Sequence, residues 1–138
     1  MLYQDIISAV GLIGVGAILK SIIDLRLKKR EVQNQAQHEF KDKRYKVIVL
    51  LAYSMLDFDK NKAELHKHSR MFETSEQLLD ELKVERTNMI LFASDKVILA
   101  INQFILSPDE DNFHILVIAM RKDLYGLNTK LNPATLKF

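Results

Sequence analysis

The most constraining feature of the sequence is an apolar stretch near its N-terminus, residues 6–23, IISAVGLIGVGAILKSII. Its charge-free run, residues 6–19, has fourteen residues, fewer than the roughly 20 that cross a bilayer core as a helix. Extension to residue 23 adds Lys20, whose ammonium group can reach the head groups because it lies near the end of the stretch. Ten Ile, Leu or Val residues contribute roughly −3 to −6 kcal/mol to insertion, against about +2.5 to +3.5 kcal/mol for a central lysine. The stretch therefore predicts a membrane-spanning helix, with a buried core helix as the alternative.

The charges around this stretch predict its orientation. Residues 20–46 include nine Lys or Arg against four Asp or Glu, a net charge of +5, whereas Asp5 precedes the stretch. Because basic flanks stay on the cytoplasmic side, we expect an inner-membrane protein with its N-terminus outside and its long C-terminal part in the cytoplasm. The acidic N-terminal segment argues against a cleaved signal peptide. The basic side chains expected at the lipid head groups are Lys20, Arg26, Lys28, Lys29 and Arg30.

Small residues within the stretch predict self-association. At 100° per residue, four of them share one helix face: Gly11, Gly14, Ala17 and Ser21. Small side chains let membrane helices approach closely, and a lone span has no partner helix in its own chain. We therefore expect this face to contact another copy, although glycine is also simply frequent in membrane helices. A phosphate-binding loop is excluded because three residues separate Gly16 from Lys20.

The remainder of the chain predicts an all-α fold. Gly and Pro number only four and two, a balance that does not suit a turn-rich β architecture. After an anchor at residues 1–23, residues 24–46 are polar on nearly every face and predict a basic helical stalk. Residues 47–138 predict a cytosolic bundle of four main helices and a short one. Its first segment, residues 47–58, indicates a core helix, with a strand as the alternative because VIVLL is rich in β-branched residues.

Local signals predict where the bundle helices begin and end. The sequence TSEQ from Thr74 resembles a capping box, and Ser94 can cap a helix over residues 95–106. The sequence SPDE from Ser107 supplies an N-cap serine, proline at the first helical position and glutamate at the third. That helix should stop at Gly126, and the Asn-Pro pair at Asn132 predicts a turn.

Motifs for catalysis and metal binding are absent from the sequence. The lack of Cys excludes thiolate catalysis and Cys-based zinc sites, and no Arg is followed at the fifth position by the His of an RxxxxH ribonuclease motif. His66 and His68 point to different faces of a helix, so we expect both to be exposed. Glu81 and Glu85 lie one turn apart on one helix face, and solvation explains them as well as acid-base work does. We therefore expect neither catalysis nor a cofactor. The basic residues lie beside the apolar stretch, whereas a nucleic-acid binder more often carries them, with interleaved aromatics, on its folded body.

Two segments of the chain resemble a known family. FASDKVILAINQFI, residues 92–105, and AMRKDLYGLNTKL, residues 119–131, are similar to the paired signatures of small bacterial membrane proteins with one N-terminal span and a helical cytosolic body. Tyr125 departs from that pattern, in which Gly follows Leu directly. The resemblance implies architecture and location, since the family has no settled activity. In layout alone, the chain is remotely similar to the membrane-anchored accessory proteins of type VI CRISPR systems, which form ring-like oligomers.

Two functional hypotheses follow. The first is a non-enzymatic membrane protein that self-associates and forms a pore or perturbs the membrane in bacterial antiviral defence. The second is a membrane-tethered binding module that recruits a cytosolic protein, with Arg121, Lys122 and Asp123 as candidate contacts. In both, the expected partners include the lipid bilayer, and nucleic acid is not among them.

Overall fold

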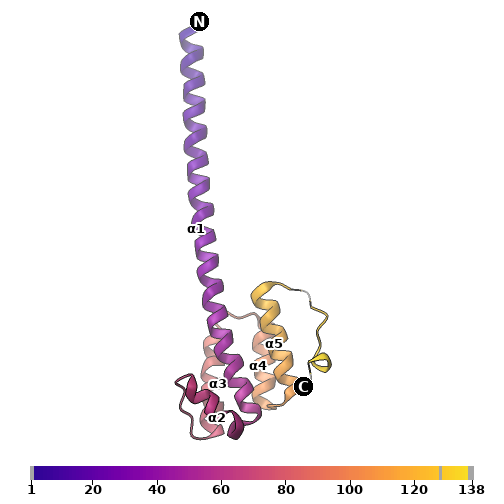
Figure 1. Cartoon of the computed structure of the whole chain (residues 1–138). Helices are drawn as coiled ribbons and strands as arrows, with labels where there is room; N and C mark the ends of the chain where they lie inside the picture. Colours follow the sequence, from indigo (N-terminus) through magenta and orange to yellow (C-terminus); the bar gives the residue numbers. More distant parts are fainter. Residues whose placement is uncertain (1, 128, 137–138) are drawn as a thin grey trace. The chain divides into compact units, whose positions relative to one another are not determined.

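The computed structural model describes residues 2–127 and 129–136, with side chains from Ala17 onward. Its elements are α1 (Leu2–Leu56), α2 (Phe58–Lys67), α3 (Ser75–Met89), α4 (Asp95–Leu106), α5 (Glu110–Tyr125) and the 3-10 helix η1 (Pro133–Thr135) (Figure 1). No strand occurs in this described part of the chain, so the all-α prediction is confirmed. The chain divides into two compact units, Met1–Glu39 and Phe40–Phe138.

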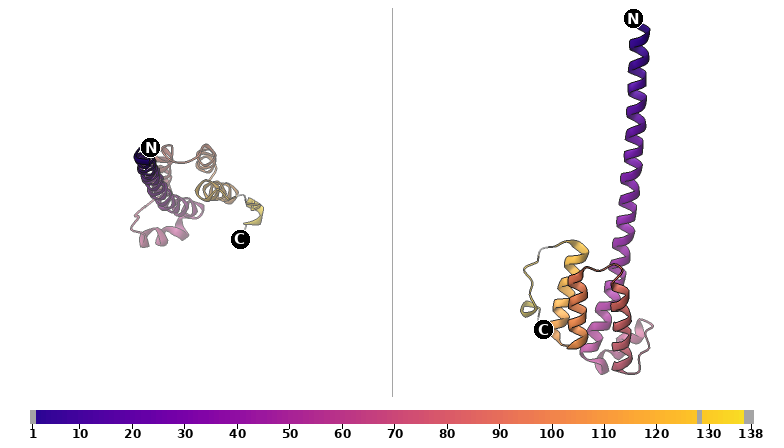
Figure 2. Two further views of the ribbon diagram at one scale, coloured as in Figure 1. Left: turned by 90° about the horizontal axis from the view of Figure 1, so that it is seen from above. Right: turned by 180° about the vertical axis from the view of Figure 1, so that it is seen from behind.

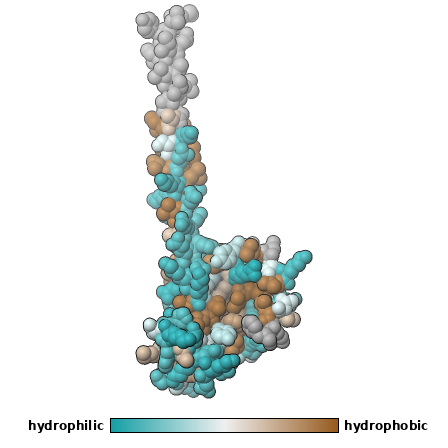
Figure 3. Space-filling model, viewed as in Figure 1, coloured by the Kyte–Doolittle hydropathy of each residue, from teal (hydrophilic) through white to brown (hydrophobic). Residues whose placement is uncertain are grey.

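The first unit consists of the N-terminal part of α1. From Ala17 to Glu39, the end of this unit, every side chain is exposed. The exposed side chains include several large apolar ones (Figure 3): Ile18, Leu19, Ile22, Ile23, Leu25 and Leu27. Among the described residues, no helix combines the length and the apolar character needed to cross a membrane. The side chains of residues 6–16, which make up most of the predicted span, lie outside that described part.

The second unit is a helical bundle built from the C-terminal part of α1 together with α2 to α5. In α1, Tyr45, Ile48 and Ala52 recur at three- and four-residue spacing and bury one helix face. Helix α4 packs against both α3 and α5 (Figure 2), and its fully buried Phe104 is among the largest side chains of the core. Residues 47–56 form a helix and not the alternative strand. They continue α1 without a break, and Ile48 and Ala52 keep the spacing of one buried helix face.

The second unit begins at Phe40 and so includes residues that hydropathy assigned to the stalk. The Phe40 ring lies edge-on to Phe92, with centroids 5.3 Å apart, and the Lys41 ammonium lies 2.8 Å from the carboxylate of Asp123. These contacts are made mainly by charged and aromatic residues. The apolar pattern of the sequence, which begins the bundle at residue 47, therefore misses its first residues.

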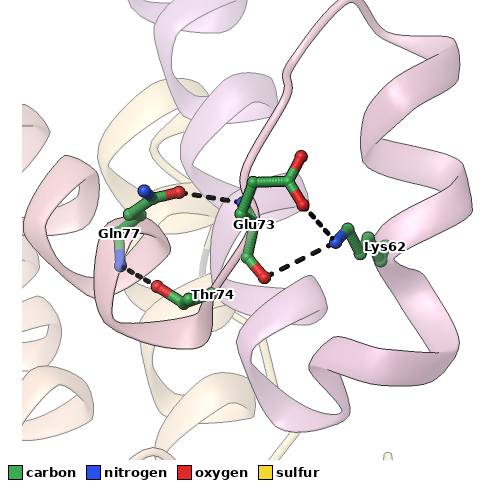
Figure 4. Close-up of polar contacts among 4 residues, drawn as sticks. All are labelled: Lys62, Glu73, Thr74 and Gln77. Carbon is green, nitrogen blue, oxygen red and sulfur yellow. Dashed lines mark hydrogen bonds and ion pairs between the residues drawn. The ribbon is translucent and has the colours of Figure 1, made fainter.

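The N-terminus of α3 is capped as the sequence predicts, with one difference. The Thr74 hydroxyl accepts a hydrogen bond from the backbone N–H of Gln77 at 3.3 Å, which confirms Thr74 as the N-cap. The Gln77 side chain accepts from the backbone N–H of Glu73 at 2.8 Å, one residue before the cap. Lys62 of α2 lies 2.9 Å from the Glu73 carboxylate, so the capping residues also connect α3 to α2 (Figure 4).

Replacing Thr74 with Ala is expected to lower the free energy of unfolding by about 1 kcal/mol, because the N–H of Gln77 loses its acceptor. Urea titration followed by circular dichroism measures the change. Ser75→Ala, one residue further on at an exposed helical position, is the matched control and should change stability by less than about 0.5 kcal/mol. Equal losses in the two variants would contradict the capping role.

The start of α5 differs from the prediction. The N-cap is Asp109 and not Ser107, and the first helical residue is Glu110. The Asp109 carboxylate accepts from the backbone N–H of Asn112 at 2.8 Å, while the Ser107 hydroxyl donates to the same carboxylate at 2.8 Å. These hydrogen bonds, that of Asn112 foremost, lower the pKa of Asp109. A negatively charged acceptor at a helix N-terminus complements the helix dipole, which explains the later start.

The C-terminal signals are confirmed. Gly126 follows α5 with a φ of 63°, and its N–H donates to the carbonyl of Lys122 at 2.8 Å. Only glycine adopts this left-handed conformation without a steric penalty. Asn132 caps η1, since its side chain accepts from the N–H of Thr135 at 3.0 Å and the Thr135 hydroxyl accepts from the N–H of Asn132 at 3.2 Å. The predicted Asn-Pro turn is therefore an ordered reciprocal cap.

Candidate ligand groove and its polar support

A groove of about 770 Å³ lies between α4, α5 and the segment that contains η1. Helix α4 contributes residues 96, 99, 100 and 103, and α5 contributes residues 115, 118, 119, 122 and 123. Both sets recur at three- and four-residue spacing, so each helix presents a single face to the groove. Leu99 and Ile115 line it while remaining 67% and 43% exposed. Apolar side chains also gather over α5 on the face of the unit that Figure 3 shows.

The two ends of the groove differ in charge. Helices α4 and α5 are packed neighbours joined by a short loop, so they run antiparallel (Figure 2). Lys96 in the first turn of α4 and Lys122 in the last turn of α5 therefore lie at the same end. Neither lysine forms an ion pair with another described residue. At the other end, the lining residues Gln103 and Ile115 carry no charge.

Asp123, beside the charged end of the groove, connects three helices. Its carboxylate is 11% exposed and accepts from the Lys41 ammonium at 2.8 Å and from the Tyr45 hydroxyl, both on α1. It also accepts from Ser94, the N-cap residue of α4, whose side chain makes no capping bond to its own helix. Asp123 thus holds α5 to α1 and to the start of α4.

The protonation states around Asp123 follow from these contacts. Burial raises the pKa of the Asp123 carboxyl, but the hydrogen bonds from Lys41, Tyr45 and Ser94 outweigh it, and the pKa lies below its ordinary value. Burial raises the pKa of the Tyr45 phenol far above its ordinary value, and the hydrogen bond to Asp123 adds to this. At neutral pH the cluster therefore holds an ionised carboxylate and a neutral phenol.

A second polar pair joins the buried Glu85 of α3 to Arg44 of α1. Glu85 is only 5% exposed, and its Oε1 lies 3.2 Å from Nη1 of Arg44. The Arg44 guanidinium also lies 5.7 Å from the ring centroid of Phe40. The other oxygen, Oε2, is buried without a hydrogen-bond partner among the described residues. The expectation that Glu85 is solvated is therefore wrong, whereas Glu81 is partly exposed and pairs with Arg70 at 3.4 Å.

A sequence signal for the burial of Glu85 does exist. The buried residues of α3 are Leu78, Leu82, Glu85 and Met89. Their spacing of four, three and four residues places Glu85 on the apolar face of the helix. The charge of Glu85 favours an exposed position, but its place in this pattern indicates the core.

The other predicted site residues belong to two different units of the chain. In the first unit, the described members of the small-residue face, Ala17 and Ser21, are exposed, and Gly11 and Gly14 lie outside the residues with described side chains. The five basic residues assigned to lipid head groups are also exposed: Lys20, Arg26, Lys28, Lys29 and Arg30. In the second unit, Arg121 and Lys122 are exposed, whereas the carboxylate of Asp123 is engaged within the unit.

The histidines provide no evidence for a metal site. His66 and His68 are both exposed, as predicted. Within the described ranges of the chain, no three His, Asp or Glu side chains are grouped so that they could hold a metal ion. A smaller pocket of about 270 Å³ includes His114 with Asp109 and Glu110. It brings together two acids and one histidine, but their arrangement does not form a metal-binding group.

No protein-family model matches the chain, and searches of curated proteins and of solved structures found no match either. The resemblance to small single-span bacterial membrane proteins therefore stays a prediction. The exposed apolar surface of α1 and the groove of the second unit are the features on which a function can be based.

Proposed function

We propose that this chain is a non-enzymatic, single-pass protein of the bacterial inner membrane, with its N-terminus outside and its helical bundle in the cytoplasm. The observation that carries the proposal is the exposed apolar surface of α1, which includes Ile18, Ile22 and Leu25. No described residue of the first unit covers these side chains. They adjoin basic residues such as Lys28 and Lys29, and an apolar helix followed by a basic flank suits an anionic cytoplasmic leaflet.

Reversing the basic flank tests this orientation. Lys28→Glu combined with Lys29→Glu should lower the ratio of N-out to N-in molecules at least tenfold, because each basic residue near the membrane surface contributes about 1 kcal/mol. The measurement is protease accessibility of terminal reporter tags in whole cells, after alkaline carbonate extraction has shown membrane integration. The control, Lys60→Glu with Lys130→Glu, makes the same charge change at exposed positions of the second unit. Extraction of the unaltered chain into the soluble fraction would refute the anchor.

Self-association is proposed through the small-residue face of the anchor, Gly11, Gly14, Ala17 and Ser21. Gly14→Leu should weaken the oligomer at least tenfold, because a bulky side chain separates the helix backbones. Val15→Leu, outside that face, is the control. The mass of the particle in detergent distinguishes the outcomes. A monomer at micromolar concentration would refute self-association, and an unchanged oligomer in Gly14→Leu would move the interface elsewhere.

Assembly of membrane helices is also the basis for proposing a pore or a membrane perturbation in antiviral defence. Vesicles that contain the purified chain should release a trapped dye, and Gly14→Leu should reduce the release together with the oligomer. Dye retention by vesicles that carry the intact oligomer would leave self-association standing and refute the pore.

The second candidate function is a membrane-tethered binding module, which the exposed end of α5 favours. Arg121 is exposed and forms no ion pair with another described residue. Affinity purification of the full chain from its native cells should then yield a stoichiometric second protein that Arg121→Glu releases. Release of that protein by the distant control Lys60→Glu as well would argue against a contact at Arg121.

A further inference from the structure

We propose that the groove between α4, α5 and the η1 segment binds a single-chain anionic amphiphile, a long-chain fatty acid. Its carboxylate would lie at Lys96 and Lys122, and its alkyl chain would extend toward Gln103 and Ile115. This inference goes beyond the proposed function, because it depends on the second unit alone.

The size and lining of the groove fit one alkyl chain. Its volume of about 770 Å³ lies within the roughly 300 to 1,000 Å³ of sites that enclose a small ligand. Between the two ends, both helices present aliphatic side chains to the groove, among them Leu99, Ile118 and Ala119. Leu99 is two-thirds exposed in the free chain, so a ligand that covers it removes apolar surface from water.

The charge distribution favours an amphiphile over a protein helix. The two lining lysines that form no ion pair with a described residue, Lys96 and Lys122, lie at one end of the groove. A docked amphipathic helix is anchored by apolar side chains at positions i, i+3, i+4 and i+7 and does not call for two cations at one end. Asp123, the acid that lines the groove, has its charge compensated by Lys41 at 2.8 Å, so it does not oppose an anion at Lys122. One anionic head group with a long apolar chain matches this arrangement.

The C-terminal segment bounds the remaining side of the groove. Leu131 and Pro133 are lining residues, and the reciprocal cap between Asn132 and Thr135 fixes the backbone there. The segment also contacts α5 through η1. It is therefore an ordered wall that would cover part of the alkyl chain.

Photo-crosslinking of the full chain in phosphatidylcholine nanodiscs tests the proposal. The probe is a 16-carbon fatty acid with a diazirine in its alkyl chain, and mass spectrometry maps the crosslinked residues. We expect crosslinks in α4 and α5 near Leu99 and Ile115, competed by palmitate and not by hexadecanol. Shortening the competitor should weaken it about fourfold for each methylene group removed. Crosslinks confined to α1, or equal competition by hexadecanol, would overturn the proposal.

Two variants separate the head-group contact from the alkyl site. Lys96→Glu with Lys122→Glu should reduce crosslinking in α4 and α5 at least tenfold, because the carboxylate loses both cations. Leu99→Trp should reduce it by filling the groove. The control is Lys60→Glu with Lys83→Glu, and circular dichroism checks that each variant is folded. Unchanged crosslinking in the double lysine variant would refute the site. A native protein that covers Leu99 and excludes the probe from the groove would refute it as well.

Discussion

Replacing Asp123 with Ala is expected to destabilise the helical bundle by about 2 to 4 kcal/mol. The substitution removes the acceptor of the Lys41 ammonium and of the Tyr45 hydroxyl. Tyr45 is only 3% exposed, so water does not readily replace the lost partner. The measurement is the free energy of unfolding from urea titration of the full chain in detergent, followed by circular dichroism.

An exposed ion pair provides the control for this prediction. Asp80 lies 2.8 Å from Lys83, the same distance as in the Asp123–Lys41 pair, but both of its side chains are largely exposed. Asp80→Ala should therefore cost less than about 1 kcal/mol. A double-mutant cycle between Asp123→Ala and Lys41→Met should give a coupling of at least about 0.5 kcal/mol. A loss no larger than that of Asp80→Ala would show that Asp123 does not support the bundle.

The same cluster predicts how stability depends on pH. The pKa of Asp123 is lowered in the folded state, so its contribution is present above the unfolded value of about 4 and is lost as pH falls through the folded value. The pKa of Tyr45 is raised, so its contribution is present below the unfolded value of about 10 and is lost as pH rises beyond it. Urea midpoints measured from pH 2 to pH 11 should fall at both ends. Asp123→Asn should flatten the acid end, and an unchanged acid profile would contradict the assignment.

Local sequence signals predicted most helices of the bundle but not the beginning of the bundle itself. The span of α4, Asp95–Leu106, follows from its apolar spacing, and the end of α5 follows from Gly126. The start of α5 was misplaced because Ser107 and Asp109 are both good N-caps, and the choice depends on which one reaches the free N–H groups. Phe40 was assigned to the stalk because its partner, Phe92, is distant in sequence.

The polar support of the groove could not be predicted from local patterns. Asp123 near the C-terminus of a helix opposes the helix dipole, and its main partner, Lys41, is 82 residues away in sequence. The charged end of the groove likewise depends on Lys96 and Lys122 of two antiparallel helices meeting in space. Glu85 differs from these, because its spacing with Leu82 already places it on the buried face of α3.

The partly buried pair of Arg44 and Glu85 predicts a loss of stability in a single variant that a second substitution reverses. Arg44→Met should destabilise the bundle by about 2 to 3 kcal/mol, because it leaves a carboxylate that is 5% exposed without its cation. The loss stays below the 3 to 5 kcal/mol typical of a fully buried pair, since the Arg44 side chain is 41% exposed and water reaches its site.

Adding Glu85→Met to Arg44→Met should restore stability to within about 1 kcal/mol of the unaltered chain or above it, because buried ion pairs replaced by apolar side chains of similar volume are often neutral or stabilising. Oε2 of Glu85 has no hydrogen-bond partner among the described residues, so the double substitution also removes an unsatisfied buried oxygen. Urea titration measures each step. Arg70 and Glu81, 3.4 Å apart and more exposed, are the control pair, and Arg70→Met should cost less than about 1 kcal/mol. If the double variant is no more stable than Arg44→Met alone, the cost comes from lost packing against Phe40 and not from an unpaired charge.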